Sequence, residues 1–220
     1  METPKRILSP EERRQRNHDE MTQNILAAAR EVMRAQGVAD LNLQEIARKV
    51  GMRAPSLYNY FPSKIAIYES LFAMGMQLYR QQYELVMEQY GATWQGLEKS
   101  MEGYLSFALE NPELYQLLFE RPVPGFHPSA EGLAEAAKLV EVGRRHTEAA
   151  IASGTLNSPF SAEVTTNLLI AIMHGLTAQH LANEPQLPSG SGRFGSLIPV
   201  FIHLLKKAWQ HDSETQKRDD

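Results

Sequence analysis

The sequence has 220 residues, of which 43% are hydrophobic and 22% are charged, a composition typical of a globular protein. It contains no cysteine, which excludes a disulfide framework and a thiolate metal site. Residues 1–24 lack the continuous apolar core of a secretory signal, and no run approaches the roughly 20 apolar residues that span a bilayer. We therefore expect a cytoplasmic protein with no membrane partner.

Charge is unevenly distributed along the chain, whose net charge is −4. Residues 1–64 carry 11 basic and 8 acidic side chains, whereas residues 65–220 carry 11 basic and 18 acidic ones. An excess of positive charge at one end is expected when only that end contacts phosphates. The distribution predicts a nucleic-acid-binding region near the N-terminus.

Apolar residues recur at helical spacing along the whole chain, and no segment alternates as a strand does, so we predict an all-α fold of about nine helices. Residues 212–220 are expected to form a disordered tail. We expect residues 1–18 to form a flexible basic arm that carries Lys5, Arg6, Arg13, Arg14 and Arg16. The predicted helices span residues 19–36, 43–50, 54–60, 64–89, 93–110, 112–119, 130–153, 161–183 and 196–210.

The sharpest pattern lies in residues 43–61, LQEIARKVGMRAPSLYNYF. Ala47 is small where a second helix would cross it, and Gly51 can adopt the positive φ of a short turn between helices. Leu57 would join both helices in one core, and Pro55 fits the first turn of the second helix, where its missing N–H costs nothing. The spacing predicts a helix-turn-helix, with an ordinary helical hairpin that binds no DNA as the alternative.

The run from Ile25 through GVADLNLQEIARKVGMRAPSLYNYFPSKIAIYESLF resembles the DNA-binding domain of the TetR family of bacterial regulators. LYNYFPSK, residues 57–64, is similar to the family's LY-x-x-F-x-x-K signature. ALENPELYQLLFERP and MHGL resemble the ligand domain of a subgroup with a Trp-His-Gly motif, although Met173 replaces the Trp. The resemblance implies a helix-turn-helix domain at residues 19–64 and a ligand-binding and dimerisation domain at residues 65–211.

The resemblance also implies double-stranded operator DNA as a partner. Gln44 can pair with adenine and Arg53 with guanine in the major groove, and contact of Arg53 with a phosphate is the alternative. Tyr60 as a core aromatic is an equal alternative to its phosphate role, and the basic arm either enters the minor groove or is simply solvated. The implied phosphate contacts are Asn42, at the N-cap of its helix, with Ser56, Tyr58, Tyr60 and Lys64, and the implied base contacts are Gln44, Arg53, Ala54 and Pro55.

Residues beyond Lys64 carry enough Met and aromatic side chains to line a cavity for a small molecule, although tight packing of each one in the core is the alternative. His174 lies in the apolar stretch LLIAIMHGL, where a neutral imidazole either orients a ligand or forms a hydrogen bond within the core. The main ligand-site candidates are Met101, Tyr104, Phe107, Tyr115, Phe119, Met173 and His174, and Leu78, Tyr79 and Phe126 are further candidates.

The last two predicted helices are apolar on more than one face, which favours a homodimer built from a four-helix interface. Phe201 and Leu205 are expected to face the partner. The leading hypothesis is a repressor released from its operator by a small ligand, with activation and co-repression as variants. A ligand-free DNA-binding or architectural protein, which differs only in lacking a cavity, is a second hypothesis.

A helical enzyme is a third hypothesis, which the sequence disfavours. His-Glu-x-x-His, a Gly-rich phosphate loop and a nucleophile elbow are all missing from the sequence. We therefore expect no catalytic site, no metal site and no cofactor.

Overall fold

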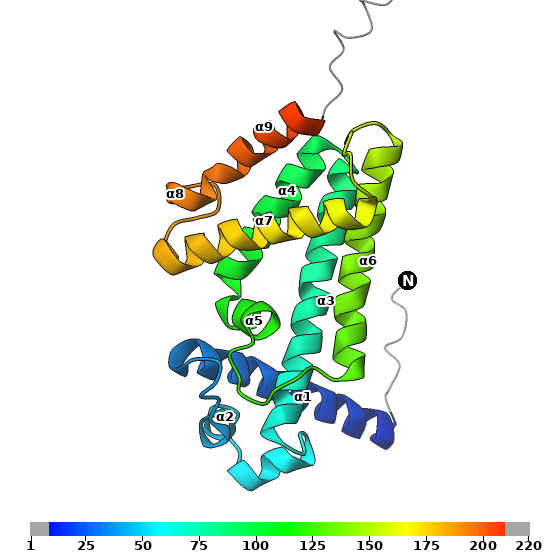
Figure 1. The fold of residues 1–220 in the computed structure, drawn as a ribbon. Coiled ribbons are helices and arrows are strands. Elements are labelled where there is room, and N and C mark those ends of the chain that lie inside the picture. Colours follow the sequence, from blue (N-terminus) through cyan, green and yellow to red (C-terminus); the bar gives the residue numbers. More distant parts are fainter. Residues whose placement is uncertain (1–8, 210–220) are drawn as a thin grey trace, which may run out of the picture.

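The computed structural model describes residues 9–209, and this range folds into nine α-helices without a strand, as predicted (Figure 1). A 3-10 helix, Ala54–Asn59 (η1), lies between α2 and α3, and a π-helical turn, Gln116–Glu120 (η2), follows α5. The α-helices are α1 (Pro10–Gln36), α2 (Leu43–Lys49), α3 (Lys64–Tyr90), α4 (Trp94–Glu110), α5 (Pro112–Tyr115), α6 (Ala130–Ala152), α7 (Ala162–Asn183), α8 (Gly192–Gly195) and α9 (Leu197–Trp209).

The first helix begins nine residues earlier than predicted, so residues 10–18 are helical and the prediction of an arm was wrong for them. Ser9 and Glu12 form a capping box: the Glu12 N–H donates to Ser9 Oγ (3.1 Å), and the Ser9 N–H donates to Glu12 Oε2 (2.7 Å). Pro10 occupies the first helical position, which suits its fixed φ. Lys5, Arg6 and the predicted tail lie outside the described residues.

The helix-turn-helix packs as the sequence predicts. Ile46, Ala47 and Leu57 are each no more than 1% exposed and join the core that α1 contributes to. Gly51 has φ +71°, the left-handed conformation that the turn between α2 and η1 requires. A side chain other than glycine would strain this turn.

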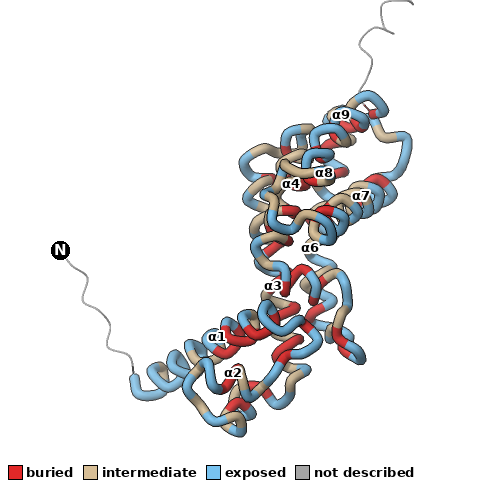
Figure 2. Tube along the Cα trace, turned by 90° about the vertical axis from the view of Figure 1, so that its left-hand side faces the viewer, coloured by how far each residue is buried: buried red, intermediate tan, exposed pale blue. Residues whose placement is uncertain are grey.

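The helices α1 and α2, with η1, form an N-terminal head, and α4 to α9 form a larger helical body. The long α3 runs unbroken from the head into the body, where it packs against α4 and α6 (Figure 1). Buried residues follow the inner faces of the helices, while the outer faces of α1 and α7 are largely exposed (Figure 2). No helix between residues 9 and 209 combines the length and apolarity needed to cross a bilayer.

The phase of α9 differs from the expected one. Leu205 is only 7% exposed and packs with Trp209 in the chain's own core, and Phe201 is partly buried against the same cluster. Both residues were expected to face outward, and that expectation was wrong. The outward stripe lies about one helical position earlier and consists of Leu197, Val200 and Leu204.

One buried ionic cluster joins the head to the body. Glu113 of α5 is 2% exposed, and its Oε1 accepts from Arg30 Nε (2.7 Å) while its Oε2 accepts from Arg34 Nε (2.5 Å). Arg30 Nη2 also donates to Asn111 Oδ1 (2.6 Å), and Arg34 Nη2 donates to the Glu110 carbonyl (3.0 Å). Because a buried carboxylate is costly without partners, this cluster fixes α1 against α5.

We expect Glu113→Ala to lower the free energy of unfolding by roughly 3 kcal/mol, because two arginines lose their shared partner. Glu110→Ala, at an exposed position whose side chain has no part in the cluster, is the matched control and should change stability by less than about 0.5 kcal/mol. Urea denaturation followed by circular dichroism measures both. Equal, small losses in the two variants would show that the cluster does not hold the junction.

Candidate DNA interface and ligand cavity

Asn42 caps α2, as predicted. Its Oδ1 accepts from the N–H groups of Gln44 (2.9 Å) and Glu45 (3.4 Å), which starts the helix at Leu43. Because Oδ1 serves the cap, the side-chain amide N–H2 is the group that Asn42 can offer to a phosphate. Gln44 lies in the first turn with its side chain exposed, a placement that suits contact with a base edge.

The second helix of the helix-turn-helix, called the recognition segment below, is the 3-10 helix η1 (Ala54–Asn59) rather than the α-helix that residues 54–60 were expected to form. Pro55 lacks an N–H, and the Ser56 N–H donates to the Arg53 carbonyl (2.8 Å), so the first turn closes tightly. Arg53, Pro55 and Tyr58 are exposed on this segment, and Tyr58 is 57% exposed. Ala54 and Ser56 are partly buried beside them.

Two of the implied DNA contacts also have structural partners within the head. The Tyr60 ring stacks on His18 of α1 with centroids 4.9 Å apart and packs against the core, as the alternative interpretation of this residue held. Lys64 Nζ donates to the Ala39 carbonyl (3.2 Å). Since an ammonium group has three donors, Lys64 keeps the capacity to contact a phosphate.

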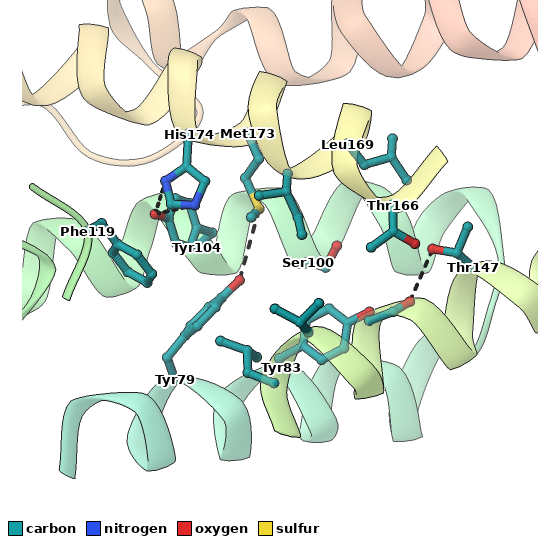
Figure 3. Close-up of a pocket in the computed structure, with 14 residues that line it drawn as sticks. Tyr79, Tyr83, Ser100, Tyr104, Phe119, Thr147, Thr166, Leu169, Met173 and His174 are labelled. Carbon is teal, nitrogen blue, oxygen red and sulfur yellow. Dashed lines mark hydrogen bonds between the residues drawn. The ribbon is translucent and has the colours of Figure 1, made fainter. Parts of the chain in front are cut away.

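A cavity of about 140 Å³ lies between α3, α4, α6, α7 and η2 (Figure 3). Tyr104, Phe119, Met173 and His174 line it, and so does Tyr79. The remaining wall residues were not among the sequence-based candidates. They are Tyr83, Ser100, Leu139, Val140, Gly143, Thr147, Thr166, Leu169 and Ile170.

Three main candidates lie away from the cavity. Met101 directly follows Ser100 on α4, so its side chain lies on a different face of the helix and packs against Ile198 and Ile202 of α9. Phe107 packs against Tyr79 with centroids 5.2 Å apart, in the core. Tyr115 lies behind the wall, with its ring edge-on to Tyr104.

The further candidates Leu78 and Phe126 are not wall residues either. Leu78 is exposed, and Phe126 packs on Tyr68 and Phe72.

His174 has a partner inside the core and also lies on the cavity wall. Its Nδ1 is 2.6 Å from the Tyr104 hydroxyl, and its ring lies 4.9 Å from the Phe119 ring, centroid to centroid. Burial lowers the pKa of His174 and raises the pKa of Tyr104, so both groups are neutral at pH 7. Two arrangements fit this contact: the phenol donates to Nδ1 and the imidazole proton is on Nε2, or Nδ1–H donates to the phenol oxygen.

The serine and threonine hydroxyl groups in the wall are already committed as donors. Ser100 donates to the Leu97 carbonyl (2.8 Å), Thr147 to the Gly143 carbonyl (3.1 Å) and Thr166 to the Ala162 carbonyl (2.8 Å). Burial raises the pKa of Tyr83 to about 12, so its phenol is also neutral. Small hydroxyl residues on otherwise apolar helix faces were the sequence signal that could have identified this part of the wall.

Two family models match the chain. One, described as "Bacterial regulatory proteins, tetR family", matches residues 25–71, and the other, "Tetracyclin repressor-like, C-terminal domain", matches residues 97–194. The first covers most of the head, and the second covers helices that form the cavity. Together they span more than half of the chain.

Curated relatives carry the same description. YobS of Bacillus subtilis (strain 168), an uncharacterized HTH-type transcriptional regulator, is 32% identical over 42% of this chain, which spans about half of YobS (48%). YdgC of the same strain, also an uncharacterized HTH-type transcriptional regulator, is 25% identical over 84% of this chain and 91% of YdgC.

A solved structure, the transcriptional regulator FadR from Bacillus subtilis in complex with stearoyl-CoA, has a TM-score of 0.65 at 16% identity. The match covers 83% of this chain and 96% of the FadR chain, and at that identity it establishes a shared fold only. The family models, the regulator relatives and the helix-turn-helix agree, and the chain belongs to the TetR family of DNA-binding transcription regulators.

Proposed function

We propose that this regulator is a cytoplasmic, homodimeric repressor that leaves its operator when a small molecule enters the cavity. The observation that carries this proposal is the position of Phe119. Its ring lines the cavity against Tyr104 and His174, and it belongs to η2, which directly follows the helix that holds Glu113. A short stretch of chain therefore joins the cavity wall to the ionic cluster on α1.

Close packing makes this connection stiff. A Cβ built on Gly75 of α3 would lie 2.8 Å from Leu118 Cδ1, so η2 rests directly on the long helix. We infer that a ligand that displaces Phe119 moves η2 and α5 together, and Glu113 then moves Arg30 and Arg34. Packed elements respond in this way by discrete shifts, because interiors have little free space.

DNA release follows from the spacing of the two heads. Recognition segments of a dimer reach successive major grooves only when they lie about 34–36 Å apart, or at a related multiple. A ligand that binds the body better in one head position shifts the population toward that position. In the released form the two segments no longer match the groove spacing.

We propose the dimer interface on the exposed faces of α7 and α9. Val164 and Leu168 on α7 are 45% and 39% exposed, and Val200 and Leu204 on α9 are 51% and 59% exposed. A Cβ built on Gly175 would meet no atom within 4 Å, so a partner helix could approach closely there. Two such pairs of helices would form a four-helix interface.

The DNA contacts proposed here are those that the resemblance implies. The residues that read base edges are Gln44, Arg53, Ala54 and Pro55. The residues that contact phosphates and so position the head are Asn42, Ser56, Tyr58, Tyr60 and Lys64. We propose no catalytic role. The relatives are described as regulators, and no group of three or more potential metal-ligand side chains occurs in the described range.

A long acyl thioester is a weaker candidate ligand, suggested by the stearoyl-CoA bound to FadR. The cavity of about 140 Å³ compares with the roughly 150 Å³ that accommodates benzene, and a stearoyl chain has three times as many carbons. The cavity would have to expand greatly to hold it.

Gln44→Ala should cost about 1–3 kcal/mol of affinity for the preferred operator and relax base choice at one position per half-site. Tyr58→Phe is the matched comparison, because loss of a phosphate contact weakens binding to all sequences about equally. Fluorescence anisotropy on the operator, selected from a random DNA pool, and on scrambled DNA measures both. If Gln44→Ala lost affinity equally on the two DNAs, Gln44 would not be a base-reading residue.

Leu204→Glu should convert the dimer to a monomer, since a charge in an apolar interface has no partner there. Leu133→Glu on α6, at a residue that is 54% exposed but not on α7 or α9, is the control and should stay dimeric. Light scattering at micromolar concentration gives the mass of each. A wild-type protein that is monomeric under these conditions would contradict the proposed interface.

His174→Phe should keep operator affinity and weaken release by the effector, if the imidazole contacts the ligand. The variant should lose about 1–3 kcal/mol of stability in either case, because the Tyr104 hydroxyl loses its His174 partner, and if His174 only fills the core the effector response should stay unchanged. Melting temperature and operator binding, with and without effector, separate the outcomes. Lost stability with an unchanged effector response would remove His174 from the ligand site.

A further inference from the structure

The enclosed part of the cavity has room for about one ring, and the cavity is open to solvent beside Val140, which is 48% exposed. Its volume is about 140 Å³, whereas cavities for drug-sized molecules range from roughly 300 to 1,000 Å³. An apolar cavity of about 150 Å³ accommodates benzene, so this one can hold a single six-membered ring with one small substituent.

The wall excludes a charged ligand. None of the fourteen lining residues is Asp, Glu, Lys or Arg, and burial lowers the pKa of His174, the one basic group among them. Of the arginines next to wall residues in sequence, Arg144 pairs with Glu141 (2.8 Å) and Arg80 pairs through Nη1 with Glu84 (2.9 Å), although the buried Nε of Arg80 has no hydrogen-bond partner. An ion in the cavity would lose its hydration without gaining an opposite charge from any of the fourteen wall residues.

The two ends of the cavity differ in chemistry (Figure 3). Tyr104, Phe119 and His174 gather at one end, with edge-to-face contacts between their rings, and Met173 lies beside them. Aromatic edges and a thioether favour an aromatic ring as the occupant. The other end carries Thr147 and Thr166, and Ser100 lies between the ends.

Hydroxyl groups at the second end act as acceptors. Thr147 and Thr166 both donate to carbonyls of their own helices, so what each can offer a ligand is an oxygen lone pair. Ser100 is in the same state, because its proton is held by the Leu97 carbonyl. A ligand that pairs with any of these three oxygens must therefore donate a hydrogen bond.

We propose that the effector is an uncharged, single-ring phenol whose ring packs against Met173 and whose hydroxyl donates to Thr147 or Thr166. This inference rests on the proposed regulatory function only in assigning the ligand a signalling role. The binding chemistry itself follows from the volume, the neutral wall and the acceptor end of the cavity.

Calorimetric titration of the full-length protein with phenol, toluene, benzoate and hexadecanoate tests the assignment. Phenol should bind about 5- to 10-fold more tightly than toluene, which has the same ring without a donor, as expected for one net hydrogen bond. Benzoate should not bind, because it is charged, and hexadecanoate should not bind, because it is charged and long. Tighter binding of toluene, benzoate or hexadecanoate than of phenol would overturn the proposal.

Variants locate the site. In Thr147→Val/Thr166→Val the ratio between phenol and toluene should fall to about 1 while toluene binding persists, because both acceptors at that end of the cavity are gone and valine has nearly the volume of threonine. Each single change is made as well, and the change at the threonine that accepts from phenol should lower the ratio by itself, with less risk to folding. Gly143→Leu should abolish binding of both probes by filling the cavity, and Ala149→Leu, on the exposed side of α6, should not. An unchanged ratio in the valine variants would overturn the placement of the hydroxyl.

Operator binding measured with the same probes separates this inference from the proposed function. If phenol binds as described but leaves DNA affinity unchanged, the ligand assignment stands and the proposal that this ligand releases the operator is wrong. If hexadecanoate releases the DNA and phenol does not, release stands and the ligand class is wrong.

Discussion

The Glu113 carboxylate, held between Arg30 and Arg34, is the contact on which the rest of the structure depends. A carboxylate that is 2% exposed is tolerable only while both cations stay in place, so α1 and α5 keep a fixed relation in this state. Because the two arginines belong to the head and the carboxylate belongs to the body, the orientation of the head is tied to the position of α5. The cluster thus provides a second connection beside the covalent one through α3.

Next to this rigid connection, the body contains the cavity. The cavity lies one short turn away from α5, and its wall is neutral, aromatic at one end and hydroxylic at the other. Empty volume lowers the cost of rearranging the surrounding side chains, whereas the closely packed η2 and α3 do not yield independently. This contrast allows a small ligand to act on a large element in the proposed mechanism.

Sequence patterns predicted the parts of the fold that depend on local geometry. Ala47, Gly51 and Leu57 gave the helix-turn-helix, since a close crossing, a positive φ and a shared core each demand a particular residue type. The start of α1 was missed although Ser9 and Glu12 form a capping box, because the charge of the following residues suggested an arm. Assignment to the Trp-His-Gly subgroup stays a prediction, with Met173 in the place of the Trp.

The site was harder to predict because it depends on helix phase and on contacts between distant segments. A shift of one residue on α4 separates Ser100, in the cavity wall, from Met101, in the α9 interface, and the same kind of shift buries Leu205 instead of Leu204. Thr147 and Thr166 meet only through the packing of α6 on α7. Pairing of Glu113 with Arg30 likewise joins residues 83 positions apart, which no local pattern encodes.

The central claim, that occupation of the cavity moves the heads, is tested most directly by the distance between the two heads of the dimer. The chain has no cysteine, so a spin label on Asn59→Cys, at the exposed end of η1, reports that distance alone in pulsed electron resonance. We expect the distances of the free protein to overlap those on operator DNA, phenol to shift them, and Glu113→Gln to weaken the shift. Phenol bound in the cavity with an unchanged distance distribution would contradict it.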